Sequence, residues 1–141
     1  MRVILDTNIL LSGIISPRGT PARLIEAWLD RRFVLISHQL QLDEIREVSR
    51  RPKLRALVKP VEIGRIVNQI ALVAAMPEML PPIERSRDPR DDFLLALCEK
   101  GVADWLVTGD KADLLALGRH GRTHIVTAAE LAEVLDMKKA P

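Results

Sequence analysis

Arg2-Val3-Ile4-Leu5-Asp6 is the stretch that decides the fold of this chain. Its apolar residues follow one another without polar alternation, which favours a strand buried on both faces of a parallel sheet. The run stops at Asp6, and open parallel sheets bind their ligands outside the carboxyl ends of the strands. Asp6 is therefore a candidate functional residue. The alternative is that Asp6 only caps the segment that follows, because Asp is a good N-cap.

The composition is that of one ordinary globular domain. The chain has 141 residues, of which 48% are hydrophobic and 28% are charged, and a chain of this size can bury a full core. No apolar run approaches the roughly 20 residues that span a bilayer, and no secretory signal precedes the first strand. The one cysteine, Cys98, lies in an apolar helical stretch and is expected to be a buried thiol. We expect a single domain over residues 1–141, located in the cytoplasm, with no membrane partner.

The net charge of +2 is a mild bias toward anionic partners. The basic residues gather in two groups, Arg46, Arg50, Arg51, Lys53, Arg55 and Lys59 in the first and Arg85, Arg87 and Arg90 in the second. Such runs also occur as solvated helix faces, so charge alone leaves nucleic-acid contact open. Tyrosine is absent and aromatic residues total 3%, which argues against a base-stacking platform. Any nucleic acid would be held mainly by its phosphates.

Short apolar runs that predict strands alternate with segments of helical period. Beyond the first strand, the predicted strands cover 33–36, 105–108 and 124–126. The predicted helices cover 7–15 and 112–117 and also follow the start signals at Thr20-Pro21, Ser37, Pro52, Pro60, Asp88-Pro89 and Thr127. This alternation predicts an α/β fold, a three-layer α/β/α sandwich on a parallel sheet of four to five strands. The extra helices between the second and third strands should form a hairpin beside the strand ends.

In the helix after Ser37, Leu40 and Ile45 are expected to point inward, with Gln41 and Glu44 on the opposite or flanking faces. The helix that begins at Asp88-Pro89 should end at Gly101, a residue type that commonly stops helices.

Acidic residues recur where parallel strands would end. Asp6 follows the first strand and Asp110 follows the third, while Glu44 and Asp92 lie on helices that flank those ends. Each has a plain alternative, because Asp110 can be an N-cap, Asp92 can complement a helix dipole, and Glu44 can face solvent. The four acids are more informative together than any one of them alone.

Carboxylates that converge in this way repel one another, and a cation that neutralises them stabilises the site. Oxygen ligands without Cys or His select Mg²⁺ or Mn²⁺ over zinc or copper. Such ions polarise a phosphodiester, lower the pKa of a bound water and stabilise the leaving 3′ oxygen. The chemistry that these acids predict is hydrolysis of a nucleic-acid backbone, with the basic groups holding the polyanion.

The chain resembles the PIN domain family. The resemblance rests on Asp6-Thr7-Asn8 after the first strand, Glu44 on a later helix, Asp92-Phe93-Leu94-Leu95-Ala96-Leu97 opening another, and Thr108-Gly109-Asp110 closing a strand. The stretches Asp88-Pro89-Arg90-Asp91-Asp92 and Val107-Thr108-Gly109-Asp110-Lys111 look most like the VapC-like branch, the toxin components of toxin–antitoxin systems. The short motifs are weak one by one and fairly specific in this order.

The resemblance implies a Mg²⁺- or Mn²⁺-dependent endoribonuclease that cuts single-stranded RNA. It assigns the metal-binding and catalytic role to Asp6, Glu44, Asp92 and Asp110. Asn8 and Thr108 would orient the acids or a bound water, and Asp113 would be an accessory ligand. Asp91 should point about 100° away from Asp92 around a helix, so we expect it to cap the helix. The implied partners are RNA, an antitoxin protein that covers the acids, and a second copy of the chain.

Two other classes of protein compete with the nuclease. A non-catalytic module that binds RNA or a partner protein is the first alternative, and the presence of all four acids counts against it. The second is a phosphotransferase that forms an aspartyl phosphate on Asp6. Haloacid-dehalogenase-like enzymes carry a second Asp two residues later, where this chain has Asn8.

Overall fold

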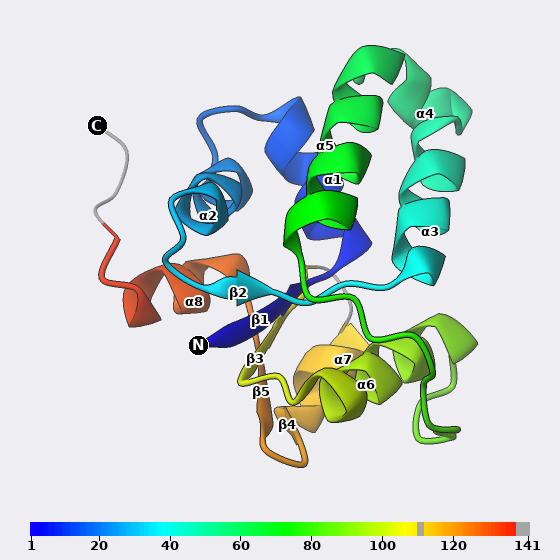
Figure 1. Cartoon of the computed structure of the whole chain (residues 1–141), viewed down its shortest axis with the longest axis vertical. Coiled ribbons are helices and arrows are strands. Elements are labelled where there is room, and N and C mark those ends of the chain that lie inside the picture. Colours follow the sequence, from blue (N-terminus) through cyan, green and yellow to red (C-terminus); the bar gives the residue numbers. More distant parts are fainter. Residues whose placement is uncertain (110–111, 138–141) are drawn as a thin grey trace.

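The computed structural model describes residues 1–109 and 112–137 and contains one five-stranded sheet in the order β2-β1-β3-β5-β4 (Figure 1). Its strands are β1 (Arg2–Leu5), β2 (Val34–Leu35), β3 (Trp105–Val107), β4 (Arg119–His120) and β5 (Thr123–Val126). Neighbouring strands are parallel except for β4, which pairs antiparallel with β5. The predicted parallel sheet is confirmed, whereas the hairpin that adds β4 was not predicted.

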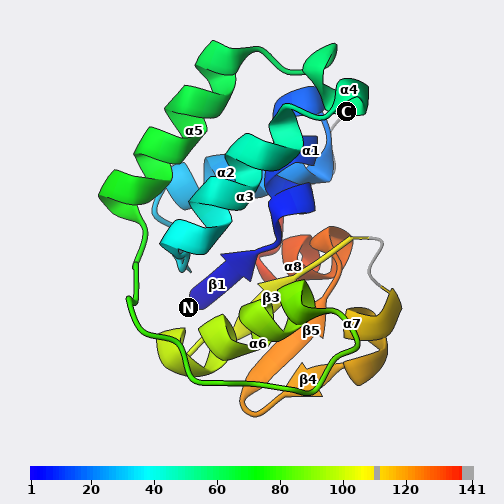
Figure 2. The same cartoon turned by 90° about the vertical axis from the view of Figure 1, so that its right-hand side faces the viewer.

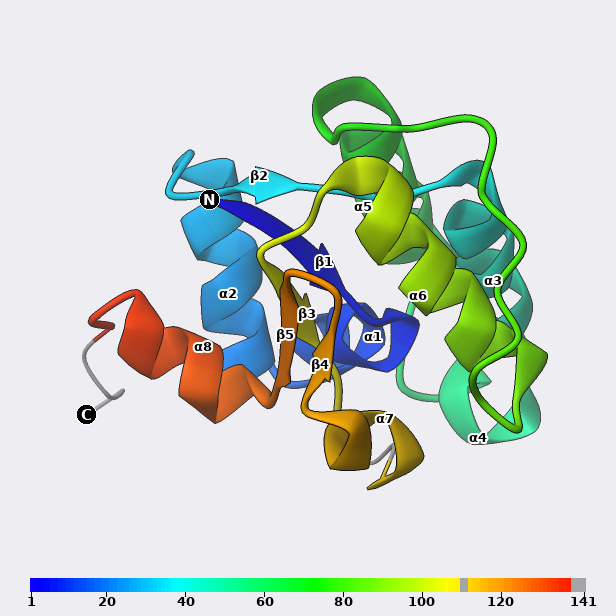
Figure 3. The same ribbon diagram turned by 90° about the horizontal axis from the view of Figure 1, so that it is seen from below.

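Helices cover both faces of the sheet (Figures 2 and 3). They are α1 (Thr7–Ile15), α2 (Thr20–Leu29), α3 (Gln39–Ser49), α4 (Pro52–Arg55), α5 (Pro60–Val73), α6 (Pro89–Gly101), α7 (Ala112–Leu117) and α8 (Ala128–Val134). The strands alternate between two buried clusters, because successive side chains point to opposite faces. Val3 and Leu5 pack with α1, α2, α3, α5 and α8, whereas Ile4 packs with α6 and α7. The predicted α/β/α sandwich is confirmed.

No helix in residues 1–109 and 112–137 is both long enough and apolar enough to cross a membrane. Cys98 is buried on α6, as predicted, and burial raises the pKa of its thiol to about 12. A thiol with so high a pKa stays protonated at neutral pH and is therefore a poor nucleophile.

The strand order reverses between β1 and β3, since the chain moves from β1 to β2 on one side and then returns to β3 on the other. Leu5 pairs with Val107 at the carboxyl end of this strand pair, and the backbone N–H of Asp6 donates to the carbonyl of Val107 at 2.9 Å. This is the topological switch point, where open α/β sheets bind their ligands.

Helices α3 and α5 form the predicted hairpin, which projects from the sheet on the side opposite α6 (Figure 2). The expected orientation of two α3 residues is wrong. Leu40 is 54% exposed, while Gln41 is only 1% exposed. Gln41 shares one helical face with the buried residues Ile45 and Val48, because positions four and seven residues apart lie on the same side of a helix.

Helix α6 begins as predicted, with Asp88 as N-cap and Pro89 in its first turn. The Asp88 carboxylate accepts the Arg90 N–H at 2.9 Å. Gly101 is the last helical residue, but the left-handed C-cap is Val102, with φ of 53°. Gly101 instead allows α6 to pack closely against Ile36. A Cβ at Gly101 would lie 2.7 Å from Cγ2 of this fully buried side chain.

Gly101→Ala is expected to lower the free energy of unfolding by about 1–3 kcal/mol, the usual cost of overpacking a core. Gly64→Ala on α5 is the matched control, because nothing lies within 4 Å of a Cβ placed there. That substitution should raise stability by about 0.5–1 kcal/mol through helix propensity. Urea unfolding of both variants measures the difference, and equal effects would show that Ile36 shifts without cost.

Candidate functional site

Asp6 lies at the switch point between β1 and β3 and is 1% exposed. Its Oδ2 accepts a hydrogen bond from the Thr108 hydroxyl at 2.9 Å, and Thr108 is itself fully buried. Asp6 occupies the N-cap position of α1, yet its side chain makes no capping hydrogen bond. The carboxylate is thus turned toward the end of β3, so simple helix capping does not account for it. Thr108 makes the contact required of a residue that orients this carboxylate.

A buried polar chain fixes the end of β1 from the other side. The Gln41 side-chain amide donates to the carbonyl of Leu5 at 2.7 Å, and the Ser37 hydroxyl donates to Oε1 of Gln41 at 2.6 Å. The two side chains connect α3 to the residue that precedes Asp6. Sequence reasoning missed this role, although the spacing of Gln41 from Ile45 and Val48 carried the signal.

Of the two adjacent acids on α6, Asp91 is the buried one, at 4% exposed. Our expectation that Asp91 caps the helix is wrong, because Asp88 does so. Asp92 is partly exposed, and its Oδ1 accepts the backbone N–H groups of Arg85 and Ser86 at 3.0 and 2.7 Å. Asp92 therefore fastens the loop before α6 to the first helical turn.

That loop is also held by a chain of side-chain hydrogen bonds. Nη1 of Arg85 donates to Nδ1 of His120 at 2.7 Å, and Nε2 of His120 donates to Glu99 at 2.6 Å. Since Nδ1 accepts, the proton of the neutral imidazole is on Nε2. Arg85 belongs to the second basic group found in the sequence, and its guanidinium is used in holding the fold together.

Glu44 lies in the hollow between α3 and the start of α6, which has a volume of about 460 Å³. It shares this hollow with the basic residues Arg51 and Arg90. The ring of Phe93 forms one wall and meets His38 edge-on at 5.8 Å. Asp92 lines an adjacent hollow that shares Phe93 with the first one but contains mostly apolar residues.

The predicted ligands are not all gathered in the structure. Within residues 1–109 and 112–137, no three acidic, histidine or cysteine side chains form a group that could hold a metal ion. Asp6 and Glu44 therefore do not form such a group with either Asp91 or Asp92, and Asp110 lies outside the described residues. Asn8 and Asp113 are both exposed. The carboxylate oxygens of Asp6 and Asp91 are the type of ligand that Mg²⁺ and Mn²⁺ prefer. The described residues by themselves do not provide a complete set of metal ligands.

The fold and this site define an α/β domain with a buried, oriented carboxylate at the switch point of its sheet. The chain belongs to the PIN domain family, whose model matches residues 2–112. PIN domains are in general metal-dependent nucleases. An uncharacterized protein of Methanocaldococcus jannaschii is 27% identical over 118 residues, which cover 83% of this chain and 75% of that protein. No solved structure gives a significant match.

Proposed function

We propose that this protein is a Mg²⁺- or Mn²⁺-dependent endoribonuclease that hydrolyses single-stranded RNA. The observation that carries the proposal is the Asp6 carboxylate, buried at the carboxyl end of β1 and held by the Thr108 hydroxyl at 2.9 Å. A buried carboxylate is costly unless it is paired, hydrogen-bonded or bound to a metal. Its location at the switch point favours a ligand role over a purely structural one.

The proposed metal ligands are Asp6, Glu44, Asp110 and one acid of α6. For α6 we favour Asp91, because its carboxylate is buried whereas Asp92 is partly exposed. Asp92, the residue expected from the sequence, is the alternative. When bound, the metal would lower the pKa of a water and stabilise the leaving oxygen of the phosphodiester.

The chain itself would hold the RNA. Arg51 and Arg90 line the hollow that contains Glu44 and present guanidinium groups to a polyanion beside the acids. Arg51 is also 3.5 Å from Glu47 in an exposed pair, and such pairs contribute little and exchange readily. The low aromatic content supports a grip on phosphates in place of bases.

Cleavage of a labelled single-stranded RNA by the purified protein tests the proposal directly. We expect hydrolysis with Mn²⁺ or Mg²⁺, no hydrolysis with EDTA, and recovery when the metal is added back in excess. A duplex of the same sequence is the matched control and should be cut far more slowly. RNA that binds but is not cut with either metal would contradict the nuclease and favour the non-catalytic module.

The narrower role that we propose is that of the toxin in a toxin–antitoxin pair, acting in the cytoplasm. Its support is the resemblance of Asp88-Pro89-Arg90-Asp91-Asp92 and Val107-Thr108-Gly109-Asp110-Lys111 to VapC-like proteins. An antitoxin would then cover the acids, and a second copy of the chain would form a homodimer. Arrest of growth when the chain is expressed alone is the observation that separates a toxin from an RNA-processing enzyme.

A further inference from the structure

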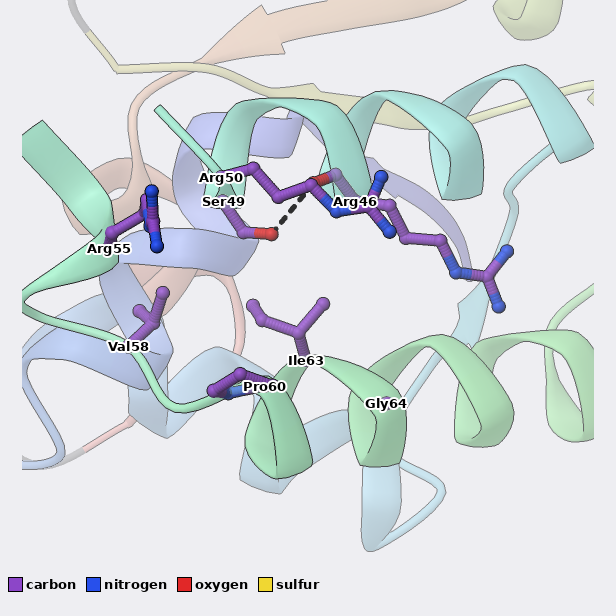
Figure 4. Close-up of a pocket in the computed structure, with 8 residues that line it drawn as sticks. All are labelled: Arg46, Ser49, Arg50, Arg55, Val58, Pro60, Ile63 and Gly64. Atoms are coloured by element: carbon purple, nitrogen blue, oxygen red, sulfur yellow. Dashed lines mark hydrogen bonds between the residues drawn. The ribbon is translucent and has the colours of Figure 1, made fainter. Parts of the chain in front are cut away.

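A second, larger hollow lies away from the acids, between α3, α4 and α5, and has a volume of about 640 Å³ (Figure 4). Arg46 and Ser49 line it from α3, Arg50 from the C-cap of that helix, and Arg55 from α4. Figure 4 shows Ser49 facing Ile63 of α5 across the hollow, with Arg55 and Val58 closing one end. Its size is within the range of pockets that hold small ligands or parts of larger ones.

The charges in this hollow are of one sign. Arg46, Arg50 and Arg55 are all exposed, and in the part of the chain that the structure describes none of them forms an ion pair with an acid. Three guanidinium groups around one space repel one another unless an anion joins them. Arginine is also the side chain best suited to a phosphate, because its planar donors bind two oxygens at once.

The walls of the hollow suit a phosphate that carries an organic group. Val58 and Ile63 are buried side chains in its lining, and Pro60 lines it as well. The Ser49 hydroxyl donates to the carbonyl of Arg46 at 2.8 Å, so its oxygen keeps acceptor capacity for a sugar hydroxyl. An apolar lining with a few polar groups is the usual form of a site that orients a ligand.

Arginine side chains line both this hollow and the one that contains Glu44. Arg51, next in sequence to Arg50, lines the Glu44 hollow after the end of α3, together with Arg90 and the acids Asp43, Glu44 and Glu47. From Glu44 to Arg50 the helix rises by about 9 Å, a length of roughly two to three stacked nucleotides at about 3.4 Å each. A strand that leaves the acids over Arg51 would therefore reach the second hollow.

We infer that the hollow between α3, α4 and α5 binds a backbone phosphate of the RNA strand, away from the bond that is cut. RNA as the ligand is taken from the proposed function, and the placement of the phosphate is new. Arg46, Arg50 and Arg55 bind the phosphate, and Val58 and Ile63 contact the adjoining nucleotide. This subsite lengthens the RNA that the protein prefers and adds salt-dependent affinity.

Binding of single-stranded RNA of about 16 nucleotides, measured in EDTA at several salt concentrations, tests the inference without cleavage. Replacing Arg46, Arg50 and Arg55 together by Gln should weaken binding about tenfold and reduce the salt slope by about 0.7 for each phosphate lost. A control removes the same charge elsewhere, with Arg18, Arg31 and Lys100, all exposed, changed to Gln. Equal losses in the two triple variants would overturn the subsite.

Gly64 offers a test that keeps every arginine. It lines the hollow, and a Cβ at this position meets no atom within 4 Å. Gly64→Glu places a carboxylate beside the guanidinium groups and should weaken RNA binding several-fold more than Gly64→Gln, which has the same size without the charge. Equal affinities of the two variants would overturn the inference.

Two further arms identify the ligand and separate the two proposals. Affinity for a dinucleotide should be the same in the arginine triple variant and the parent, and an equal loss on both RNAs would overturn the remote placement. Uridine monophosphate should not compete with the RNA strand for the protein. Competition that is lost in the arginine triple variant would show that the hollow binds a free nucleotide, and would overturn the assignment to the strand.

If Mn²⁺ supports no cleavage while the arginine triple variant still binds RNA more weakly, the nuclease proposal fails and the subsite stands. If cleavage occurs and the arginine effect is absent, only the subsite fails.

Discussion

Asp6→Asn is expected to reduce the Mn²⁺-dependent cleavage of single-stranded RNA by about 10²–10³-fold, or below detection. Asn keeps the size of the side chain and its acceptor for the Thr108 hydroxyl, while the charge is lost. A metal contributes several kcal/mol to the transition state, and about 1.4 kcal/mol corresponds to a factor of ten in rate. The single-turnover cleavage rate at saturating Mn²⁺ measures the loss.

The fold should survive this substitution. Removing a buried charge leaves stability unchanged or raises it slightly when no metal is present, so the thermal unfolding midpoint is the check. Asp30→Asn is the matched control and should cut RNA at the parental rate, because Asp30 is exposed at the C-cap of α2 and lines neither the Glu44 hollow nor the hollow of Asp92. Parental cleavage by folded Asp6→Asn protein would refute the nuclease mechanism. A toxin role adds that expression of the Asn variant should no longer arrest growth.

Asp91→Asn is expected to reduce cleavage about a hundredfold or more, for the same loss of a metal ligand. Asp92→Asn should stay within about tenfold of the parent, because the amide oxygen still accepts the N–H groups of Arg85 and Ser86. Replacing Asp92 by Ala should instead lower the free energy of unfolding by about 1–3 kcal/mol, as two hydrogen bonds to a charged group are lost.

Asp91 and Asp92 are adjacent residues of the same type, so each Asn variant is a matched control for the other. The measurements are the cleavage rate for both Asn variants and urea unfolding for Asp92→Ala. If Asp92→Asn loses most activity while Asp91→Asn keeps it, Asp92 is the α6 ligand, as the sequence motif indicated. Equal losses would mean that both carboxylates act on the metal or that the loop before α6 positions the site.

The first strand and its terminal acid could be predicted because their signals are local. Four residues without polar alternation specify a buried strand, and the position of Asp6 at its end follows from the chain itself. The start of α6 was equally local, since Asp88 and Pro89 form a standard N-terminal signal. The alternation of strands with helices predicted a parallel sheet but not the order of its strands.

The side chains around the site were harder to predict, because their orientation depends on packing between distant elements. The exposure of Leu40 and the burial of Gln41 are set by how α3 docks beside β1, and the hydrogen bond from Gln41 to Leu5 balances the burial of a polar group. Asp91 and Asp92 are adjacent and chemically identical. They differ in burial and in the groups that the preceding loop donates to them, a hydroxyl to Asp91 and two backbone N–H groups to Asp92.

The hydrogen bond between Thr108 and Asp6 joins residues that are 102 positions apart in the chain. At a synthesis rate of about 5–20 residues per second, the ribosome needs roughly 5–20 s to add Thr108 after Asp6. Until then the aspartate has no partner from β3, and the edge of β1 that β3 will occupy is open. If the protein is the ribonuclease that we propose, a nascent chain would be inert toward the messenger that encodes it, and cleavage would begin only once β3 has been made and paired with β1.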